Sequence, residues 1–413
     1  MKEWFARWGG WLLLFVLAAA YYPSFGKGLD SVALYAEAGR CMLRAQELLP
    51  CVPMFSYQPA LAVLMIPFVF IPTVLHKLVW YVVCIGSLVI VVRIAEAMAE
   101  RLYPGVTRGN SGLWLRGICL FLSSKHILDC LNYHVYELPA LAIMMTGLWS
   151  LTVGREASGG FLLAVAAAIR ATPLIFLPYL VVRLRYVALA AMVVGFTAVS
   201  LLPDAIGLLN GGHIGFLGDW IHQVATPMIK PGSTSDVAFW SAWNGTNLNN
   251  QSIRGLVNRF TDGPVMGFSP GMIVLALYAV VGLVLAVVFL KSPRTKEYAP
   301  IDGCVLLIAM LALSPMTSRY HYIFILPAYF LVVAAAMADR RTRIFAGAAA
   351  ALCFVLVTGT SNDLVGRRMT ELAYLYGFMT LGAMFLFAAL AALLLVWRPP
   401  AITAAQQEKP RAP

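Results

Sequence analysis

Long apolar runs alternate with short polar segments along almost the whole chain. Runs of about twenty residues have the length of an α-helix that crosses a bilayer. The pattern predicts about twelve spans, at residues 5–22, 58–75, 77–98, 112–130, 134–153, 158–183, 186–206, 270–291, 301–316, 321–338, 343–360 and 371–397. We therefore expect an all-α polytopic membrane protein with a single transmembrane domain over residues 1–413, ending in a disordered cytoplasmic tail at 399–413.

The first apolar run resembles a secretory signal peptide, since basic residues precede it and it ends in three alanines. Trp4, Trp8 and Trp11 lie on one helical face, however, as in an aromatic anchor at the headgroups. We expect a retained first helix.

Two long hydrophilic loops, residues 23–57 and 207–269, are predicted on the external face. In the first, apolar residues form one helical stripe and charged residues the other, which predicts an amphipathic helix in the membrane interface. The apolar stripe is Val32, Tyr35, Gly39, Met42 and Leu43, and the charged stripe is Glu37, Arg40, Arg44 and Glu47. The second loop contains Trp220, Trp240 and Trp243 and a helix-like stretch at 253–260. Aromatic and amide side chains are typical of sugar sites, although a purely structural loop accounts for them equally well.

Composition excludes a water-soluble fold, because 61% of the residues are hydrophobic and only 12% are charged, against about 25% charged in soluble domains. The net charge of +11 does not indicate nucleic-acid binding, because the cations stand in short clusters between apolar runs. We interpret Arg183 with Arg185, and the cluster at 340–343, as cytoplasmic topology signals and contacts with anionic lipids. Arg101, Arg108 and Arg155 do not fit this topology, so either the fourth to sixth spans are miscounted or those segments are short helices that do not cross fully.

The seven cysteines form no C-x-x-C pair and have no histidine at metal-ligand spacing, so no metal or haem site is predicted. Five lie in apolar stretches and are expected to be small buried hydrophobic residues. Cys41 and Cys51 share the first external loop and could pair in an oxidising periplasm.

Asp30 is the first acid after the first span. It is a good N-cap for the helix that follows. A partly desolvated carboxylate at the membrane surface could also accept a proton from a hydroxyl substrate, and the two roles can coexist.

The segment Ser314 to Tyr322 joins a proline-broken turn to Arg319 and His321. Such a break at membrane depth is tolerated where it lines a cavity or is buried in protein. Both side chains can hold a phosphate; the alternative is that they anchor a helix end at the headgroups.

Three further segments carry candidate chemistry. Asn249 to Gly255 places amides and a hydroxyl before Arg254 near a helix start, which suits sugar hydroxyls and an anion as well as plain capping. Tyr57 and Gln58 stand at the entrance to the second span. Arg170 lies inside an apolar run, where a cation is costly and therefore functional or paired.

The order of these segments resembles glycosyltransferase family 87 of the GT-C superfamily. The matching segments, after Asp30, are Ala36 to Arg40, Tyr57 to Pro59, Leu131 to Tyr133, Gly154-Arg155, Arg170 to Pro173, Asn250 to Ser252, Ser314-Pro315 and His321-Tyr322. The chain departs from the family at Asn132-Tyr133-His134, where the family usually has Asn-Gly-Gln, and at Arg170, where it has Lys.

The resemblance implies periplasmic catalytic loops, inverting transfer from a lipid-phosphate sugar, a catalytic aspartate matching Asp30 and a histidine near the donor phosphate matching His321. By physical argument we add Arg319 and Arg254 as donor-phosphate residues. Tyr35, Glu37, Tyr57, Gln58, Asn249, Gln251 and Trp243 are predicted to contact sugar or acceptor.

The expected function is transfer of a sugar, most simply mannose, from polyprenyl phosphate to a lipid or glycan acceptor at the periplasmic side of the inner membrane, without metal or other cofactor and without nucleic acid. An arabinofuranose donor is an alternative. Arg170 beside Pro173 also suits a transporter or lipid flippase, but polar loops on one face and the lack of an internal repeat favour a transferase. A non-catalytic scaffold is the third interpretation.

Overall fold

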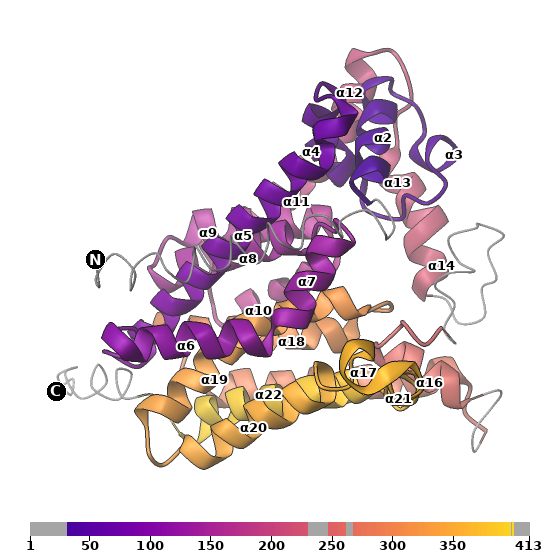
Figure 1. The fold of residues 1–413 in the computed structure, drawn as a ribbon. Helices are drawn as coiled ribbons and strands as arrows, with labels where there is room; N and C mark the ends of the chain where they lie inside the picture. Colours follow the sequence, from indigo (N-terminus) through magenta and orange to yellow (C-terminus); the bar gives the residue numbers. More distant parts are fainter. Residues whose placement is uncertain (1–30, 230–246, 262–266, 398, 400–413) are drawn as a thin grey trace.

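The computed structural model describes residues 31–229, 247–261, 267–397 and 399. Within these ranges the chain is helical and has no β-strand (Figure 1). The helices are α2 (Ser31–Leu43), α3 (Leu48–Cys51), α4 (Pro59–Val69), α5 (Thr73–Leu102), α6 (Gly109–Leu122), α7 (Ser124–Asn132), α8 (Glu137–Thr152), α9 (Glu156–Ile169), η2 (Thr172–Ile175), α10 (Phe176–Val182), α11 (Tyr186–Ser200), α12 (Leu202–Leu209), α13 (Phe216–Trp220), η3 (Ile221–Ala225), α14 (Thr226–Ile229), α16 (Ile253–Phe260), α17 (Pro270–Lys291), η4 (Lys296–Tyr298), α18 (Ala299–Leu313), η5 (Arg319–Ile325), α19 (Leu326–Ala338), α20 (Arg343–Val357), α21 (Asn362–Leu375) and α22 (Phe378–Leu395).

Five helical stretches in the described part of the chain are long and apolar enough to cross a membrane: 73–102, 186–209, 270–291, 319–338 and 378–395. A sixth is added if α20 and α21, which meet at an angle of 79°, form one broken span. The all-α membrane class is therefore confirmed. The count of about twelve spans stays a prediction, and the predicted first span lies outside the described residues.

Several predicted spans are interrupted or short. Predicted span 58–75 corresponds to α4, which has only 11 residues and is about 16 Å long, roughly half a hydrocarbon core. Predicted span 158–183 ends its first helix at Ile169, where Arg170 adopts an extended conformation. Pro173 then lacks the N–H that a continuous helix would need. These breaks place polar residues inside the fold.

The predicted amphipathic helix is confirmed as α2, while its place in the membrane interface stays a prediction. Val32, Tyr35 and Met42 are fully buried, while Arg44 is exposed. The buried face packs on α4, and Gly39 makes this close approach possible: a Cβ there would lie 2.8 Å from the Met65 carbonyl oxygen.

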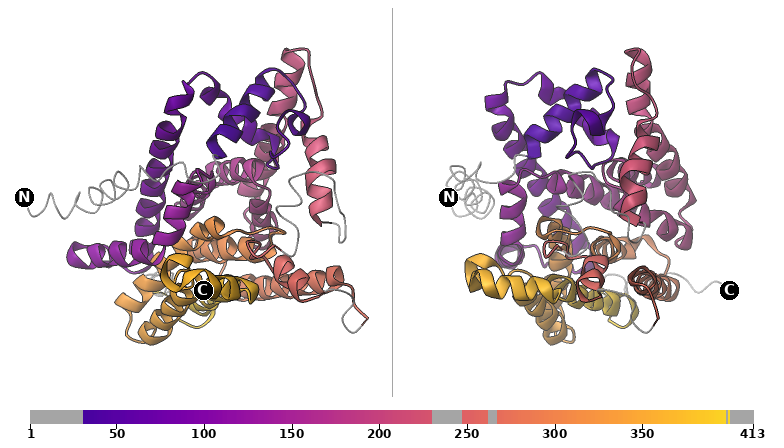
Figure 2. Two further views of the ribbon diagram at one scale, coloured as in Figure 1. Left: turned by 45° about the vertical axis from the view of Figure 1, so that its right-hand side comes forward. Right: turned by 90° about the vertical axis from the view of Figure 1, so that its right-hand side faces the viewer.

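The two predicted loops meet at one end of the molecule. Asn210 Nδ2 donates to the Leu43 carbonyl at 2.9 Å, and the His213 amide donates to the Ala45 carbonyl at 2.7 Å. Figures 1 and 2 show α2 and α3 beside α12 and α13. The first loop is therefore held by the start of the second.

The other described end of the second loop lies elsewhere. Its predicted helix at 253–260 is confirmed as α16. Ser252 caps this helix, because its Oγ accepts a hydrogen bond from the Gly255 backbone N–H at 3.1 Å. Figure 1 shows α16 near α17 and α21, away from α2. The long loop thus bridges two regions of the fold.

Helices α8, α9 and α11 form a tight layer that small residues make possible. At Gly160 of α9, a Cβ would lie 2.0 Å from the Ala188 carbonyl oxygen of α11. Close approach through small residues is the usual way in which membrane helices associate.

The interpretation of Arg183 and Arg185 as lipid contacts is wrong. Arg183 is 4% exposed, and its Nη2 and Nε donate to the two carboxylate oxygens of Asp302 at 2.6 and 2.9 Å. Arg185 Nη1 lies 3.2 Å from Glu156 Oε1, with a side chain 9% exposed. Both arginines join helices inside the fold. The cluster at 340–343 does keep its arginines exposed.

Candidate active site

His321 is buried at the start of η5. Its Nδ1 accepts a hydrogen bond from the Ser318 backbone N–H at 2.6 Å, as part of a capping box. Nδ1 is therefore unprotonated, and the hydrogen of the neutral ring sits on Nε2. Nε2 lies 3.0 Å from Glu137 Oε1, so the imidazole donates to this carboxylate.

Glu137 begins α8 and is 1% exposed. The same Oε1 that accepts a hydrogen bond from His321 also accepts one from Arg170 Nη1 at 3.2 Å, while Oε2 has no hydrogen-bond partner among the described residues. Arg170 is further oriented by a bond from its Nε to Thr172 Oγ1 at 2.9 Å. Its guanidinium carbon lies 5.2 Å from the centre of the Phe324 ring. We call Glu137, Arg170 and His321 the buried charge cluster.

Aromatic rings separate this cluster from α2. Tyr57 packs edge-on against Tyr136 and Tyr35, at centroid distances of 5.0 and 5.4 Å, and Tyr136 directly precedes Glu137. Burial raises the pKa of Tyr35 and Tyr57 well above the usual value, so both phenols stay protonated and can donate. The fold thus brings three predicted residues, Tyr35, Tyr57 and His321, into one region.

Arg319 contacts a different helix from His321. Its guanidinium stacks 4.8 Å from the Tyr133 ring centre and bonds the Tyr133 hydroxyl. Its Nε lies 3.7 Å from Asp129 Oδ1 of α7, and Lys125 Nζ lies 3.6 Å from the same oxygen. The Arg319 side chain is 30% exposed. It is therefore a partly accessible cation beside the buried charge cluster.

The Asn250 to Ser252 motif is tied to the Ser314–Pro315 turn. Asn250 Oδ1 accepts from the Thr317 amide at 3.2 Å, and the Gln251 amide donates to the Thr317 carbonyl at 2.6 Å. The Gln251 side chain is fully buried, and its Nε2 donates to the carbonyls of Leu248 and Tyr374 at 2.7 and 2.9 Å. Two motifs that are 65 residues apart are thus parts of one structure.

Of the arginines near this motif, Arg259 holds it in place. Its Nη1 donates to the Asn250 carbonyl at 2.6 Å. Arg254 is partly buried on the same helix, and desolvation lowers the pKa of both arginines. Asn249 is exposed. Arg259 was not identified from the sequence, because nothing in its spacing distinguishes it from Arg254.

Gln58 and Glu37 have protein partners in the structure. With its amide turned to satisfy both atoms, the buried Gln58 donates to the carbonyls of Ala167 and Ala168 at 2.9 and 2.6 Å. It thereby joins the start of α4 to the end of α9. Glu37 forms an ion pair with Arg40 on the partly exposed face of α2. Their predicted contacts with sugar or acceptor stay predictions.

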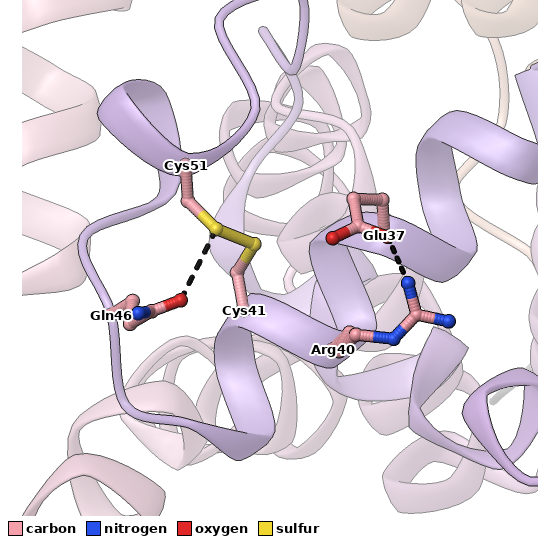
Figure 3. Close-up of a disulfide and its surroundings, with 5 residues drawn as sticks. All are labelled: Glu37, Arg40, Cys41, Gln46 and Cys51. Carbon is pink, nitrogen blue, oxygen red and sulfur yellow. Dashed lines mark hydrogen bonds and ion pairs between the residues drawn. A yellow bond between two sulfur atoms is a disulfide. The ribbon is translucent and has the colours of Figure 1, made fainter.

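Cys41 and Cys51, whose pairing the sequence left open, form a disulfide (Figure 3). It links α2 to α3 across ten residues, and Gln46 and the Glu37–Arg40 pair lie around it. The other five cysteines are free and buried, as expected.

A small open pocket lies between the two loops, with a cavity volume of about 20 Å³. It is lined by Glu47, Leu48, Leu49, Phe55, Tyr57, Pro59, Phe216, Asp219, Trp220 and Gln223. Tyr57 belongs both to this pocket and to the aromatic group beside the buried charge cluster.

Two predicted residues, Asp30 and Trp243, lie outside the described residues. In sequence, Asp30 directly precedes Ser31, which begins α2. Among the described residues, no three His, Cys, Asp or Glu side chains gather to hold a metal ion.

Glu137 was missed in the sequence. The signal was present, because a carboxylate in an apolar run is as costly as the cation at Arg170 and needs a partner. The sequence therefore indicates that Glu137 needs a buried partner, while the structure identifies the partners as Arg170 and His321.

The model of glycosyltransferase family 87 matches residues 55–315. This range holds Tyr57, Glu137 and Arg170 and ends at the Ser314–Pro315 turn. The chain belongs to glycosyltransferase family 87.

One curated protein that the chain is similar to is a polyprenol-phosphate-mannose-dependent alpha-(1-2)-phosphatidylinositol pentamannoside mannosyltransferase from Mycobacterium tuberculosis. It is 27% identical over 279 residues, which are 66% of this chain and 57% of the relative. The chain thus matches little more than half the length of this relative. No solved structure matches this family 87 chain.

Proposed function

We propose that the protein transfers a sugar from a polyprenyl-phosphate donor to a hydroxyl group of a lipid or glycan acceptor, with inversion at the anomeric carbon. The family match over residues 55–315 carries the proposal of a glycosyltransferase. The relative's dependence on polyprenol-phosphate-mannose supports this donor class, with mannose as the first sugar to test and arabinofuranose as the alternative.

In this mechanism Asp30 acts as the general base. It accepts the proton of the acceptor hydroxyl while that oxygen attacks the anomeric carbon, and the bond to the phosphate oxygen breaks on the opposite side. Support comes from its place in the sequence before α2, whose Tyr35 packs among the aromatic rings next to Glu137.

The leaving polyprenyl phosphate is a stable anion, so that cations can stabilise its growing charge without a metal. Arg319 is the best placed of the three predicted phosphate residues, since its guanidinium is partly accessible. His321 would contribute through the Nε2–H that it now donates to Glu137. Arg254 would act from α16.

We propose that the site faces the periplasm of a bacterial inner membrane. The disulfide between Cys41 and Cys51 supports this orientation, because disulfides persist in oxidising compartments and are rare in the cytosol. The start of α2, which follows Asp30, lies on the same disulfide-linked segment.

The test is transfer of labelled sugar from synthetic polyprenyl-phosphate mannose or arabinofuranose by the purified protein in detergent. Asp30→Asn should lose about 100-fold to 10,000-fold in turnover, the usual contribution of a general base, while it still elutes as a folded protein. Near-normal turnover by this variant would remove Asp30 from the role.

A transporter would instead move the sugar-lipid across vesicles without cleaving it. Arg170 was the residue that favoured this alternative. Its ion pair with Glu137 explains how a cation is accommodated in an apolar run without a role in transport. Translocation of labelled sugar-lipid with no transfer product would contradict the transferase.

A further inference from the structure

The connection between α20 and α22, which contains α21, returns to the level at which it leaves α20. α20 ends at Val357 and α22 begins at Phe378. These two ends pack side by side, since a Cβ on Gly382 of α22 would lie 2.5 Å from Val357 Cγ2. In Figure 1, α21 lies at this end of α20 and α22, next to α16. Because α22 is long and apolar enough to cross a membrane, a connection that begins and ends at one level beside it does not itself cross.

The direction of α21 agrees with this topology. α21 makes an angle of 79° with α20, so that it runs nearly across the ends of the helices that it joins. Thr370 Oγ1 donates to the Thr360 carbonyl at 2.9 Å and thereby ties α21 to the turn after α20. If α20 follows the membrane normal, α21 is close to the membrane plane.

The residues of α21 after the kink at Gly366 divide into three faces. Residues three, four or seven positions apart share one side of a helix, and the three sides are buried, exposed and apolar, and exposed and charged. The buried side is Thr370, Ala373 and Tyr374, the exposed apolar side is Met369, Leu372 and Tyr376, and the charged side is Arg367, Arg368 and Glu371.

An exposed apolar side beside a cationic side is typical of a helix that lies in the plane of a membrane surface. We infer that α21 lies flat in the bilayer interface, with Met369 and Leu372 toward the acyl chains and the two arginines at the headgroups. The negative lipid phosphates complement Arg367 and Arg368 in charge. The inference goes beyond the proposed function, because it holds whatever group the protein transfers.

Two exposed aromatic rings at the end of α21 support this position. Tyr376 stacks on Phe260 of α16 with ring centres 5.9 Å apart, and both residues are more than half exposed. Tyrosine is enriched at membrane–water interfaces, where its ring contacts apolar groups and its hydroxyl reaches water. α16 and α21 therefore meet at the depth expected for the interface.

Continuity with a lipid-facing helix favours lipid over a second protein as the partner of this surface. α16 packs on α17, which is long and apolar enough to cross a membrane and buries only 22% of its most apolar stretch. The exposed apolar side chains of α17 thus lead through Phe260 to those of α21. One partner, the bilayer, covers both.

The first turn of α21 is also bonded to the surroundings of Arg319. Lys125 Nζ donates to Asp363 Oδ2 at 2.8 Å and lies 3.6 Å from Asp129 Oδ1. Arg319 Nε lies 3.7 Å from the same Asp129 oxygen. A flat α21 therefore sets Arg319 near the depth of lipid phosphates. For the proposed function, this is the depth at which the phosphate of a lipid-linked donor would lie.

Fluorescence quenching of the full-length protein in liposomes measures the depth of α21. Single variants Met369→Cys and Arg368→Cys carry a bimane label, and the lipids carry a nitroxide either near the headgroup or near the end of the acyl chain. We expect the shallow nitroxide to quench the label at 369 about twofold more than the deep one, because interfacial helices enter only about 5–10 Å. The label at 368 should be quenched by aqueous iodide.

Val280→Cys is the matched control, because it is 56% exposed near the middle of α17 and should be quenched more by the deep nitroxide. Leu372→Cys lies on the same side as Met369→Cys and should repeat its result. The five free cysteines are buried, and wild type taken through the same labelling gives the background.

Stronger quenching of the 369 label by the deep nitroxide overturns the inference, because α21 would then be part of a span. Quenching by iodide alone also overturns it, because the surface would face water. Protection from all three quenchers overturns it in favour of a protein partner such as a second copy. Sugar transfer is not measured, so failure of the proposed function leaves this result unchanged.

Discussion

Two buried arginine–carboxylate groups in this protein differ in how completely they are bonded. Arg183 and Asp302 form a closed pair: both carboxylate oxygens are used, and the Tyr179 hydroxyl adds a bond at 3.1 Å. Arg183 Nη1 also donates to three backbone carbonyls, those of Phe289, Ser292 and Pro293, at 3.0 to 3.1 Å.

The buried charge cluster is open by comparison. Arg170 reaches Glu137 through one nitrogen at 3.2 Å, and within the described part of the chain Glu137 Oε2 has no hydrogen-bond partner. A buried carboxylate oxygen without a donor is costly. The closed pair therefore joins helices. In the open cluster, Glu137 Oε2 can still accept a hydrogen bond from a substrate or from water.

The largest expected effect comes from breaking the closed pair. Asp302→Ala leaves the Arg183 guanidinium buried without its counter-charge, which should lower stability by about 3–5 kcal/mol. Thermal unfolding in detergent measures this loss. The double variant Arg183→Met with Asp302→Leu should recover most of the stability, because an apolar pair of similar volume needs no counter-charge. Equal instability of both variants would show that the pair is not the cause.

Replacing the carboxylate of the open cluster should affect activity more than stability. Glu137→Gln keeps the shape but removes the charge that faces His321 and Arg170, so we expect turnover per folded protein to fall about 100-fold. We expect it to lose less stability than Asp302→Asn, because Arg170 reaches Glu137 through one nitrogen only. Asp302→Asn is the matched control and should show the reverse. Turnover lost only in proportion to folded protein would make Glu137 structural.

The disulfide constrains α2, because Cys41 lies in this helix. Tyr35 of α2 packs on Tyr57 among the aromatic rings beside the buried charge cluster. Cys41→Ser with Cys51→Ser should lower stability by about 2.7 kcal/mol, the chain-entropy value for a ten-residue loop. Thermal unfolding with and without reductant checks this, because reductant should shift wild type toward the variant and leave the variant unchanged. A reductant-insensitive wild type would contradict the expectation.

The smallest expected effect is that of a conservative change at Arg170. Arg170→Lys keeps the charge but loses the fork that bonds Glu137 and Thr172 together. We expect about a tenfold loss in turnover, measured at saturating donor. Thr172→Val removes only the second of these contacts and should cost less. A larger loss in Thr172→Val would show that the helix break, and not the charge, matters.

The sequence predicted features whose partners are near in the chain. Cys41 and Cys51 are ten residues apart in one loop, and the stripes of α2 and the helix at 253–260 follow from helical spacing. Arg183 was misinterpreted because its partner, Asp302, is 119 residues away, and a buried arginine has the same local pattern as a topology signal. Short helices in the fourth to sixth spans were one of two alternatives from the sequence, but the break at Arg170 was not located, because hydropathy does not detect where a helix stops inside an apolar run.

The candidate site was predicted in part for the same reason. His321 and Tyr57 were identified, but the partners of Glu137 became visible only when η5, α8 and the end of α9 were seen together. The bonding of Gln251 to backbone carbonyls also depends on contacts that spacing does not encode. The assignments of Asp30 and Trp243 remain predictions from the sequence.

The bond between the Ser318 amide and His321 Nδ1 has a consequence for proton transfer. A main-chain N–H is supplied by every residue type except proline, so the tautomer of this imidazole is set by the backbone and survives nearly any change of side chain at position 318. Only a proline there would leave Nδ1 without its donor and release the ring to carry its hydrogen on either nitrogen. The direction in which His321 can give up a proton is therefore a property of the turn.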